Sequence, residues 1–158
     1  MQRQTMLAVT MVAVAAGLSS SSANAGVTSY AGSNCVQEVT MTPRIAYQSG
    51  RIFAQQTSRS YLVCPAVQQG GRLLSAQVTG RDLSIDDNVS CYASSHNEWD
   101  TAGVNTPSVS SGTGTNFTLA LASMPSFFAN GSKNIHCIMP ANTGMDGSSI
   151  GAYVVSEQ

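Results

Sequence analysis

The sequence predicts an all-β fold, a single-domain antiparallel β-sandwich held by two disulfides. Apolar and polar residues alternate with a period of two in short runs, and turn-forming residues separate these runs. No stretch after residue 25 keeps a helical period over about ten residues. Runs of this kind are typical of sandwiches with about seven to nine strands, in an Ig-like or jelly-roll-like arrangement.

The alternation is clearest at Leu73–Thr79, where Leu74, Ala76 and Val78 face one way and the polar residues between them face the other. Read in order along the chain, the same pattern predicts strands at Arg44–Tyr47, Arg51–Gln55, Tyr61–Val67, Leu73–Thr79, Val89–Ser94, Asn116–Ala122, Asn134–Met139 and Ser149–Ser156. The first two of these strands flank Gln48-Ser49-Gly50, which predicts a hairpin.

The segment Ser95–Thr115 shows no strand period and carries the only tryptophan, Trp99. We therefore predict that it is the long loop of the domain. Loops of this length inside a compact domain are uncommon, and they are usually either functional or mobile.

The N-terminus has the three parts of a secretory signal peptide: Arg3 in a positive region, an apolar run from Met6 to Leu18, and Ala23-Asn24-Ala25 as a small-x-small cleavage site. The apolar run has about 13 residues, fewer than the roughly 20 that span a bilayer. We expect residues 1–25 to be cleaved and residues 26–158 to form one secreted domain, periplasmic or extracellular, with no membrane span.

The four cysteines, Cys35, Cys64, Cys91 and Cys137, all follow this leader. An even number of cysteines in an exported chain predicts disulfides, and three connectivities are open. Cys91 and Cys137 are both in phase with apolar neighbours on their strands, so our preferred pairing is 91–137 with 35–64. No two cysteines have the close spacing of zinc ligands, and we expect no metal and no cofactor.

The chain has seven Lys and Arg against eight Asp and Glu, and only 9% of its residues are charged. A nucleic-acid partner requires a basic stripe, which this composition lacks. We therefore expect no nucleic acid among the partners.

The segment Gly147–Gly151 reads G-x-S-x-G, the motif that carries the nucleophile of α/β-hydrolases. Only seven residues follow it, and none of them is the histidine that the mechanism needs. We interpret the match as chance in a chain rich in Gly and Ser, and we predict no catalytic residues and no enzyme activity.

Asp82, Asp86 and Asp87 form an acidic cluster between two predicted strands. Their oxygens suggest a calcium site, but their spacing does not fit an EF-hand loop. Because Asp is favoured in turns for its local hydrogen bonds, we favour a solvated turn over a calcium site.

Glu98 and Asp100 flank Trp99 on the predicted long loop. An indole ring can stack on the apolar face of a sugar while neighbouring carboxylates bond its hydroxyls, so these three residues are the candidate ligand contacts. The alternative, which we regard as the more common arrangement, is that Trp99 folds back and covers one end of the sandwich.

Three short cysteine-containing motifs lie in the predicted strands: Val63-Cys64-Pro65, Val89-Ser90-Cys91 and Cys137-Ile138-Met139-Pro140. In this respect the chain resembles a loose group of small exported bacterial proteins with disulfides and an all-β fold. The group has no assigned activity, so the resemblance implies export, disulfides and the fold without naming a ligand.

The leading hypothesis is therefore a non-catalytic secreted or cell-surface module that binds a glycan, a cell-surface protein or another copy of itself. The alternative is a structural envelope or filament subunit, assembled through exposed strand edges. A small secreted hydrolase is the third hypothesis.

Overall fold

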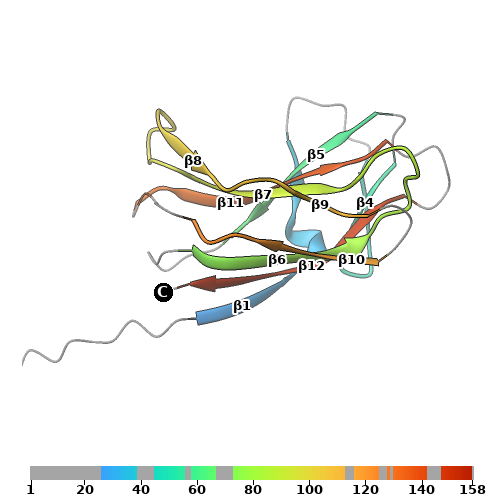
Figure 1. Cartoon of the computed structure of the whole chain (residues 1–158), viewed down its shortest axis with the longest axis horizontal. Coiled ribbons are helices and arrows are strands. Elements are labelled where there is room, and N and C mark those ends of the chain that lie inside the picture. Colours follow the sequence, from blue (N-terminus) through green and yellow to red (C-terminus); the bar gives the residue numbers. More distant parts are fainter. Residues whose placement is uncertain are drawn as a thin grey trace, which may run out of the picture.

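The computed structural model describes residues 26–38, 45–55, 58–66, 73–112, 116–124, 128, 130–141 and 147–157. These residues form two antiparallel sheets that pack face to face (Figure 1). The predicted leader, residues 1–25, lies outside the described residues. In the part of the chain described, no helix has the length and apolar character needed to cross a membrane.

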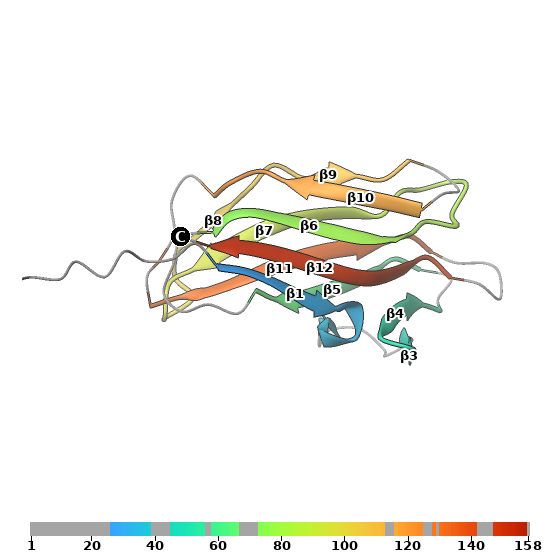
Figure 2. The ribbon, with the colours of Figure 1, turned by 90° about the horizontal axis from the view of Figure 1, so that it is seen from below.

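Sheet A has the strand order β10 (Asn116–Leu121), β6 (Leu73–Arg81), β12 (Ser149–Glu157), β4 (Arg51–Ala54), β3 (Ile45–Gln48), with β1 (Gly26–Ala31) also paired to β12. Sheet B has the order β2 (Val36–Gln37), β5 (Ser60–Pro65), β11 (Ser132–Met139), β7 (Ser90–His96), β8 (Gly103–Asn105), with β9 (Val109–Ser110) also paired to β7. One short 3-10 helix, η1 (Gly32–Asn34), joins β1 to the segment before β2. Figure 2 shows β1 lying along β12 at the edge of sheet A.

The all-β sandwich is confirmed, and each of the eight predicted strands is present, as β3 to β7 and β10 to β12. In β10 every second residue is buried, as the period of two predicts. In β6 the inward positions include Ala76 and Val78, while the side chain of Leu74 is not described and Leu73 is buried. Burial of these inner faces supplies the main stabilising term of the fold.

The two sheets are also joined by a hydrogen bond. Tyr153 of β12 is fully buried, and its hydroxyl donates to the carbonyl oxygen of Pro65 in β5 at 2.8 Å. Burial, with a smaller electrostatic contribution from Tyr30, raises the pKa of Tyr153 to about 12, so the hydroxyl stays a donor across the physiological range. The rings of these two tyrosines are stacked, with centroids 5.0 Å apart.

The prediction that Ser95–Thr115 is a loop is wrong for much of its length. β8 and β9 both pair with β7, and between them Thr106 bonds β7 through its backbone N–H to Ala93 at 2.9 Å. β8 is a mostly exposed edge strand of three residues, and Pro107 interrupts the segment after it. The buried residues Thr106 and Ser111 therefore do not belong to an alternating run. β1 escaped prediction because five of its six residues are exposed.

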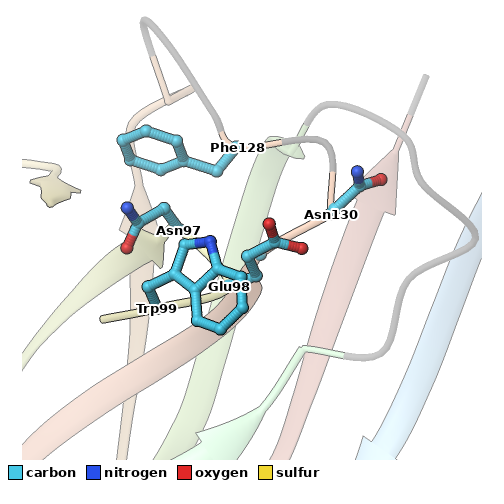
Figure 3. A pocket seen from close by; sticks show the side chains of 6 residues that line it. Asn97, Glu98, Trp99, Phe128 and Asn130 are labelled. Carbon is cyan, nitrogen blue, oxygen red and sulfur yellow. The ribbon is translucent and has the colours of Figure 1, made fainter. Parts of the chain in front are cut away.

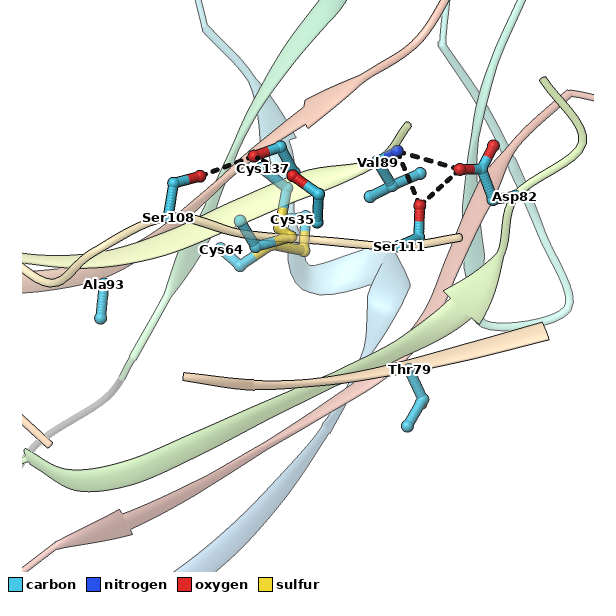
Figure 4. The surroundings of a disulfide bond; sticks show 12 residues. Cys35, Cys64, Thr79, Asp82, Val89, Ala93, Ser108, Ser111 and Cys137 are labelled. Carbon is cyan, nitrogen blue, oxygen red and sulfur yellow. Dashed lines mark hydrogen bonds between the residues drawn. A yellow bond between two sulfur atoms is a disulfide. The ribbon is translucent and has the colours of Figure 1, made fainter. Parts of the chain in front are cut away.

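Both disulfides join residues in or next to strands of sheet B, and the preferred connectivity is confirmed. Figure 4 shows Cys35 and Cys64 in their surroundings. Cys91 and Cys137 are direct cross-strand partners on β7 and β11. Cys35 precedes β2 and bonds Cys64 on the neighbouring β5. All four cysteines are buried in the core, where the two bonds cross-link adjacent segments of sheet B. The described residues contain no group of three or more His, Cys, Asp or Glu that could hold a metal ion.

The acidic turn after β6 is only partly solvated. Asp86 is exposed and Asp87 pairs with Arg59 at 2.6 Å, as expected for a surface turn. Asp82, in contrast, is fully buried, and the prediction of a solvated turn is wrong for this residue. Its carboxylate accepts four hydrogen bonds, and those donors repay the cost of burying the carboxylate.

Two of the four donors to Asp82 come from the same turn, and the other two come from distant parts of the chain. The hydroxyls of Ser111 and Ser148 donate at 2.5 and 3.0 Å, and the backbone N–H groups of Val89 and Ser84 donate at 3.0 and 3.1 Å. Figure 4 shows the bonds of Asp82 to Val89 and Ser111. This network ties the end of β6 to the segments that precede β7 and β12 and follow β9.

Candidate functional site

The loop of the β7–β8 hairpin, residues 97–102, is held in shape by its own hydrogen bonds. The side-chain oxygen of Asn97 accepts the backbone N–H groups of Thr101 and Ala102 at 2.8 and 3.2 Å. The Asn97 side-chain amide donates to the Thr101 hydroxyl at 2.8 Å. These bonds let Asn97 replace part of a backbone ladder, which is why asparagine suits this turn.

Asp100 fixes the other side of the same loop. Its φ is 53°, a left-handed conformation that Asp tolerates better than most residues, and its carboxylate lies 2.9 Å from Nδ1 of His96. This contact directs Asp100 back toward β7. Of the three predicted ligand contacts, Asp100 is thus the one that does not line the pocket described below.

Trp99 stands at the tip of this ordered loop and is 75% exposed. It therefore does not cover an end of the sandwich, which was the alternative interpretation of this residue. A single exposed tryptophan is the kind of amphipathic surface that interfaces favour, because it offers a large contact area at low conformational cost.

The connection between β10 and β11 faces this loop. The Phe128 backbone N–H donates to Oγ of Ser95 at 3.1 Å, and the Gly131 N–H donates to the Phe128 carbonyl at 3.1 Å. A Cβ on Gly131 would lie 1.7 Å from the backbone oxygen of His96. Only glycine permits so close an approach, and it seats this connection against the end of β7.

Between the two segments lies a pocket of about 320 Å³, within the size range of small-ligand sites. The β7–β8 loop contributes Asn97, Glu98 and Trp99, and the facing connection contributes Phe128, Asn130 and Gly131. Figure 3 shows the side chains of Trp99, Glu98 and Asn97 on one side and those of Phe128 and Asn130 on the other. The site thus combines two aromatic rings with one carboxylate and two amides.

Sequence reasoning identified Trp99 and Glu98 but missed Asn97, Phe128 and Asn130 as pocket residues. The Asn130-Gly131 pair is a turn signal in the sequence, but nothing there connects it with Trp99. The connection comes from the pairing of Ser132 with His96, which brings the start of β11 to the end of β7.

The G-x-S-x-G segment contributes none of the described residues that line this pocket. Ser149 belongs to β12 and is 1% exposed, in agreement with the prediction of a terminal strand. Ser149 is therefore buried within a strand and does not stand on the exposed turn that a nucleophile elbow requires.

His136 occupies the outer face of sheet B, where it stacks on Tyr92 with ring centroids 5.0 Å apart. Burial lowers the pKa of His136 from its usual value, against the pull of nearby Glu38 and with a smaller contribution from His96. Its Nε2 is buried and has no hydrogen-bond partner in the described structure. The neutral imidazole is therefore the form that the fold accommodates.

This lowered pKa makes folding stability depend on pH. As the pH falls from about 6.5, the unfolded chain binds a proton at His136 before the folded chain does, so the free energy of unfolding decreases with acidification. Urea denaturation at pH 7 and pH 5 should show a larger loss of stability for the native protein than for His136→Gln. An equal loss in both proteins would show that His136 does not carry this effect.

No model of a known protein family matches the chain, and no curated protein matches it. In structure the chain is similar to a variant of a carbohydrate-binding module of family 29, with 12% identity and a TM-score of 0.50, over 84% of this chain and 92% of that one. It is also similar to CBM35 from Paenibacillus barcinonensis, with 17% identity and a TM-score of 0.40, over 81% of this chain and 97% of that one.

A third similar structure is a GH26-CBM35 β-(1,4)-mannanase from Podospora anserina, with 9% identity and a TM-score of 0.48. The match covers 84% of this chain, which spans only 28% of that enzyme. At these identities the comparisons establish the β-sandwich fold alone, and the family 29 structure carries that conclusion.

Proposed function

We propose that this chain is a non-catalytic secreted or cell-surface module that binds a glycan in the pocket beside Trp99. The observation that carries the proposal is an exposed Trp99 on a hydrogen-bonded loop, opposite Phe128 and next to polar groups. The predicted leader and the two disulfides support a location outside the cytosol.

The chemistry of the pocket suits a sugar. A pyranose ring presents apolar C–H faces, which stack on indole and phenyl rings, and hydroxyls at its rim, which both donate and accept hydrogen bonds. Glu98 supplies an acceptor, and Asn97 and Asn130 supply amides, although Asn97 already uses its amide within the loop. Because the loop is ordered by its own hydrogen bonds, little conformational entropy is lost on binding. The names of the structural neighbours, carbohydrate-binding modules, are consistent with this proposal.

Replacing Trp99 with alanine should abolish most of the binding. The loss of a central tryptophan contact typically costs about 2 kcal/mol, or about 30-fold in Kd. Affinity electrophoresis through gels containing galactomannan, xylan or hydroxyethylcellulose would identify the polysaccharide that retards the native protein, and titration calorimetry would give the change in Kd.

Ile85→Ala is the matched control. Ile85 is 81% exposed and lies before β7, whereas Trp99 follows β7. The Ile85→Ala substitution therefore removes an exposed apolar side chain that is not part of the pocket. Equal retardation of the native and Trp99→Ala proteins would contradict the proposed site. Concentration-dependent polymers in sedimentation would favour the structural-subunit alternative, and turnover of the polysaccharide would contradict a non-catalytic role.

A further inference from the structure

A second pocket of about 320 Å³ lies on the outer face of sheet A. Four strands contribute to it: Asn116 and Thr118 from β10, Thr79 and Arg81 from β6, Gly151 from β12 and Arg51 from β4. It is separate from the Trp99 pocket, because the two share no lining residue. β10 begins at this groove and leads through the following connection to Phe128, so the two sites lie toward opposite ends of the sandwich (Figure 1).

A β-bulge opens the floor of this groove. The register of β12 against β6 passes from Ile150 opposite Gly80 to Ala152 opposite Thr79, which leaves Gly151 as the extra residue. A Cβ built on Gly151 would point toward Arg51, with Nε 3.9 Å away, and would meet no closer atom than the Thr79 carbonyl oxygen at 3.7 Å. The glycine therefore leaves space between the arginines that a side chain would fill.

The groove holds an unusual share of the positive charge. The described part of the chain has four cationic side chains: Arg59 pairs with Asp87, Lys133 is buried, and the other two are Arg51 and Arg81. Both Arg51 and Arg81 are exposed, and neither has a side-chain hydrogen bond or ion pair among the described residues. Among the described residues that line the groove, none carries a carboxylate.

We propose that this groove binds an anionic group of a polysaccharide, the carboxylate of a uronic acid or a sulfate ester. Guanidinium groups bind planar carboxylates and sulfates through paired N–H donors. Thr118 and Asn116 add neutral polar groups beside Arg81, which suit the hydroxyls next to the charge. The choice of a polysaccharide as carrier rests on the proposed function, whereas the anion site rests on the groove alone.

The test is titration calorimetry of the full chain with trigalacturonate, with a sulfated carrageenan oligosaccharide and with neutral cellotriose. Arg51→Gln combined with Arg81→Gln should weaken binding of at least one charged ligand by about tenfold or more, since two charge-assisted contacts are lost. Gly151→Leu should do the same while keeping both charges, because its side chain fills the groove. The charged ligand that responds identifies the group as carboxylate or sulfate.

Arg59→Gln is the matched control, because it removes one positive charge from an exposed position outside the groove and should leave binding unchanged. Thermal denaturation would confirm that each variant is folded. The proposal is overturned if neither charged ligand binds, if Gly151→Leu and the arginine variants bind as the native protein does, or if Arg59→Gln weakens binding equally. If Trp99→Ala abolished binding of the charged ligand while the arginine variants still bound it, the groove would not be the anion site. The proposed Trp99 site would then remain supported.

Discussion

Replacing Cys91 and Cys137 together with alanine should lower the free energy of unfolding by about 4 kcal/mol. The bond closes a loop with a sequence separation of 46 residues, and it therefore restricts the unfolded chain strongly. Because both sulfurs are buried between the sheets, the alanines also leave unfilled volume in the core. A net stability of about 5 to 15 kcal/mol leaves little margin for such a loss.

Urea denaturation of the double variant, compared with the native protein at the same pH and temperature, measures this effect. The matched comparison is the double replacement of Cys35 and Cys64, whose separation is 29 residues and whose expected loss is about 3.6 kcal/mol by the same chain-entropy relation. If the unfolding free energy fell by less than about 1 kcal/mol for the 91–137 pair, the disulfide would add little to the backbone hydrogen bonds that already join β7 and β11.

The limits of sequence reasoning here follow from which strands are half buried. A period of two predicts β10 and β11 because each has one face in the core and one in water. The edge strand β9 has only two residues, Val109 and Ser110, which are too few to show a period. The neighbouring residues Thr106 and Ser111 also bond to Ala93 and Val89, so the edge is held partly by residues outside the strand. Edge strands of this kind are defined by their neighbour and not by their own pattern.

The candidate pocket was half predictable for a related reason. Trp99 and Glu98 were singled out by composition, since a lone tryptophan beside carboxylates in a polar segment is conspicuous. Phe128 is about 30 residues further along the chain, and its position depends on the glycine that lets the connection approach β7. Register and close backbone contact are properties of the folded chain that no single segment encodes.

The burial of the charged residues in the turn after β6 also depends on contacts with distant parts of the chain. Asp86 and Asp87 remain at the surface, while Asp82, four residues earlier than Asp86, is fully buried. Its burial depends on serine hydroxyls that come from positions 111 and 148. The composition of the turn therefore predicts two of these residues and misleads about the third.

Asp82→Ala should destabilise the fold by about 3 to 5 kcal/mol, comparable to breaking a buried ion pair. The Ser111 and Ser148 hydroxyls would lose their acceptor, and the buried N–H of Val89 would keep only its 3.0 Å bond to Ser111. Asp82→Asn should cost less, because an amide oxygen can still accept from one pair of donors. Asp86→Ala, on the exposed part of the same turn, should change stability by less than about 0.5 kcal/mol.

Urea denaturation of these three variants measures their loss of unfolding free energy, which should increase with the number of acceptor oxygens removed from the buried network. A double-mutant cycle between Asp82→Ala and Ser111→Ala measures how strongly the two residues are coupled. If Asp82→Ala were as stable as Asp86→Ala, the buried carboxylate would not hold the sandwich together. Asp82 follows Arg81 of β6, and its partner Ser148 precedes Ser149 of β12. Their hydrogen bond therefore also fixes the two strands that form the floor of the arginine groove. Asp82→Asn should therefore weaken binding in that groove more than in the Trp99 pocket, which is built from the other end of β7.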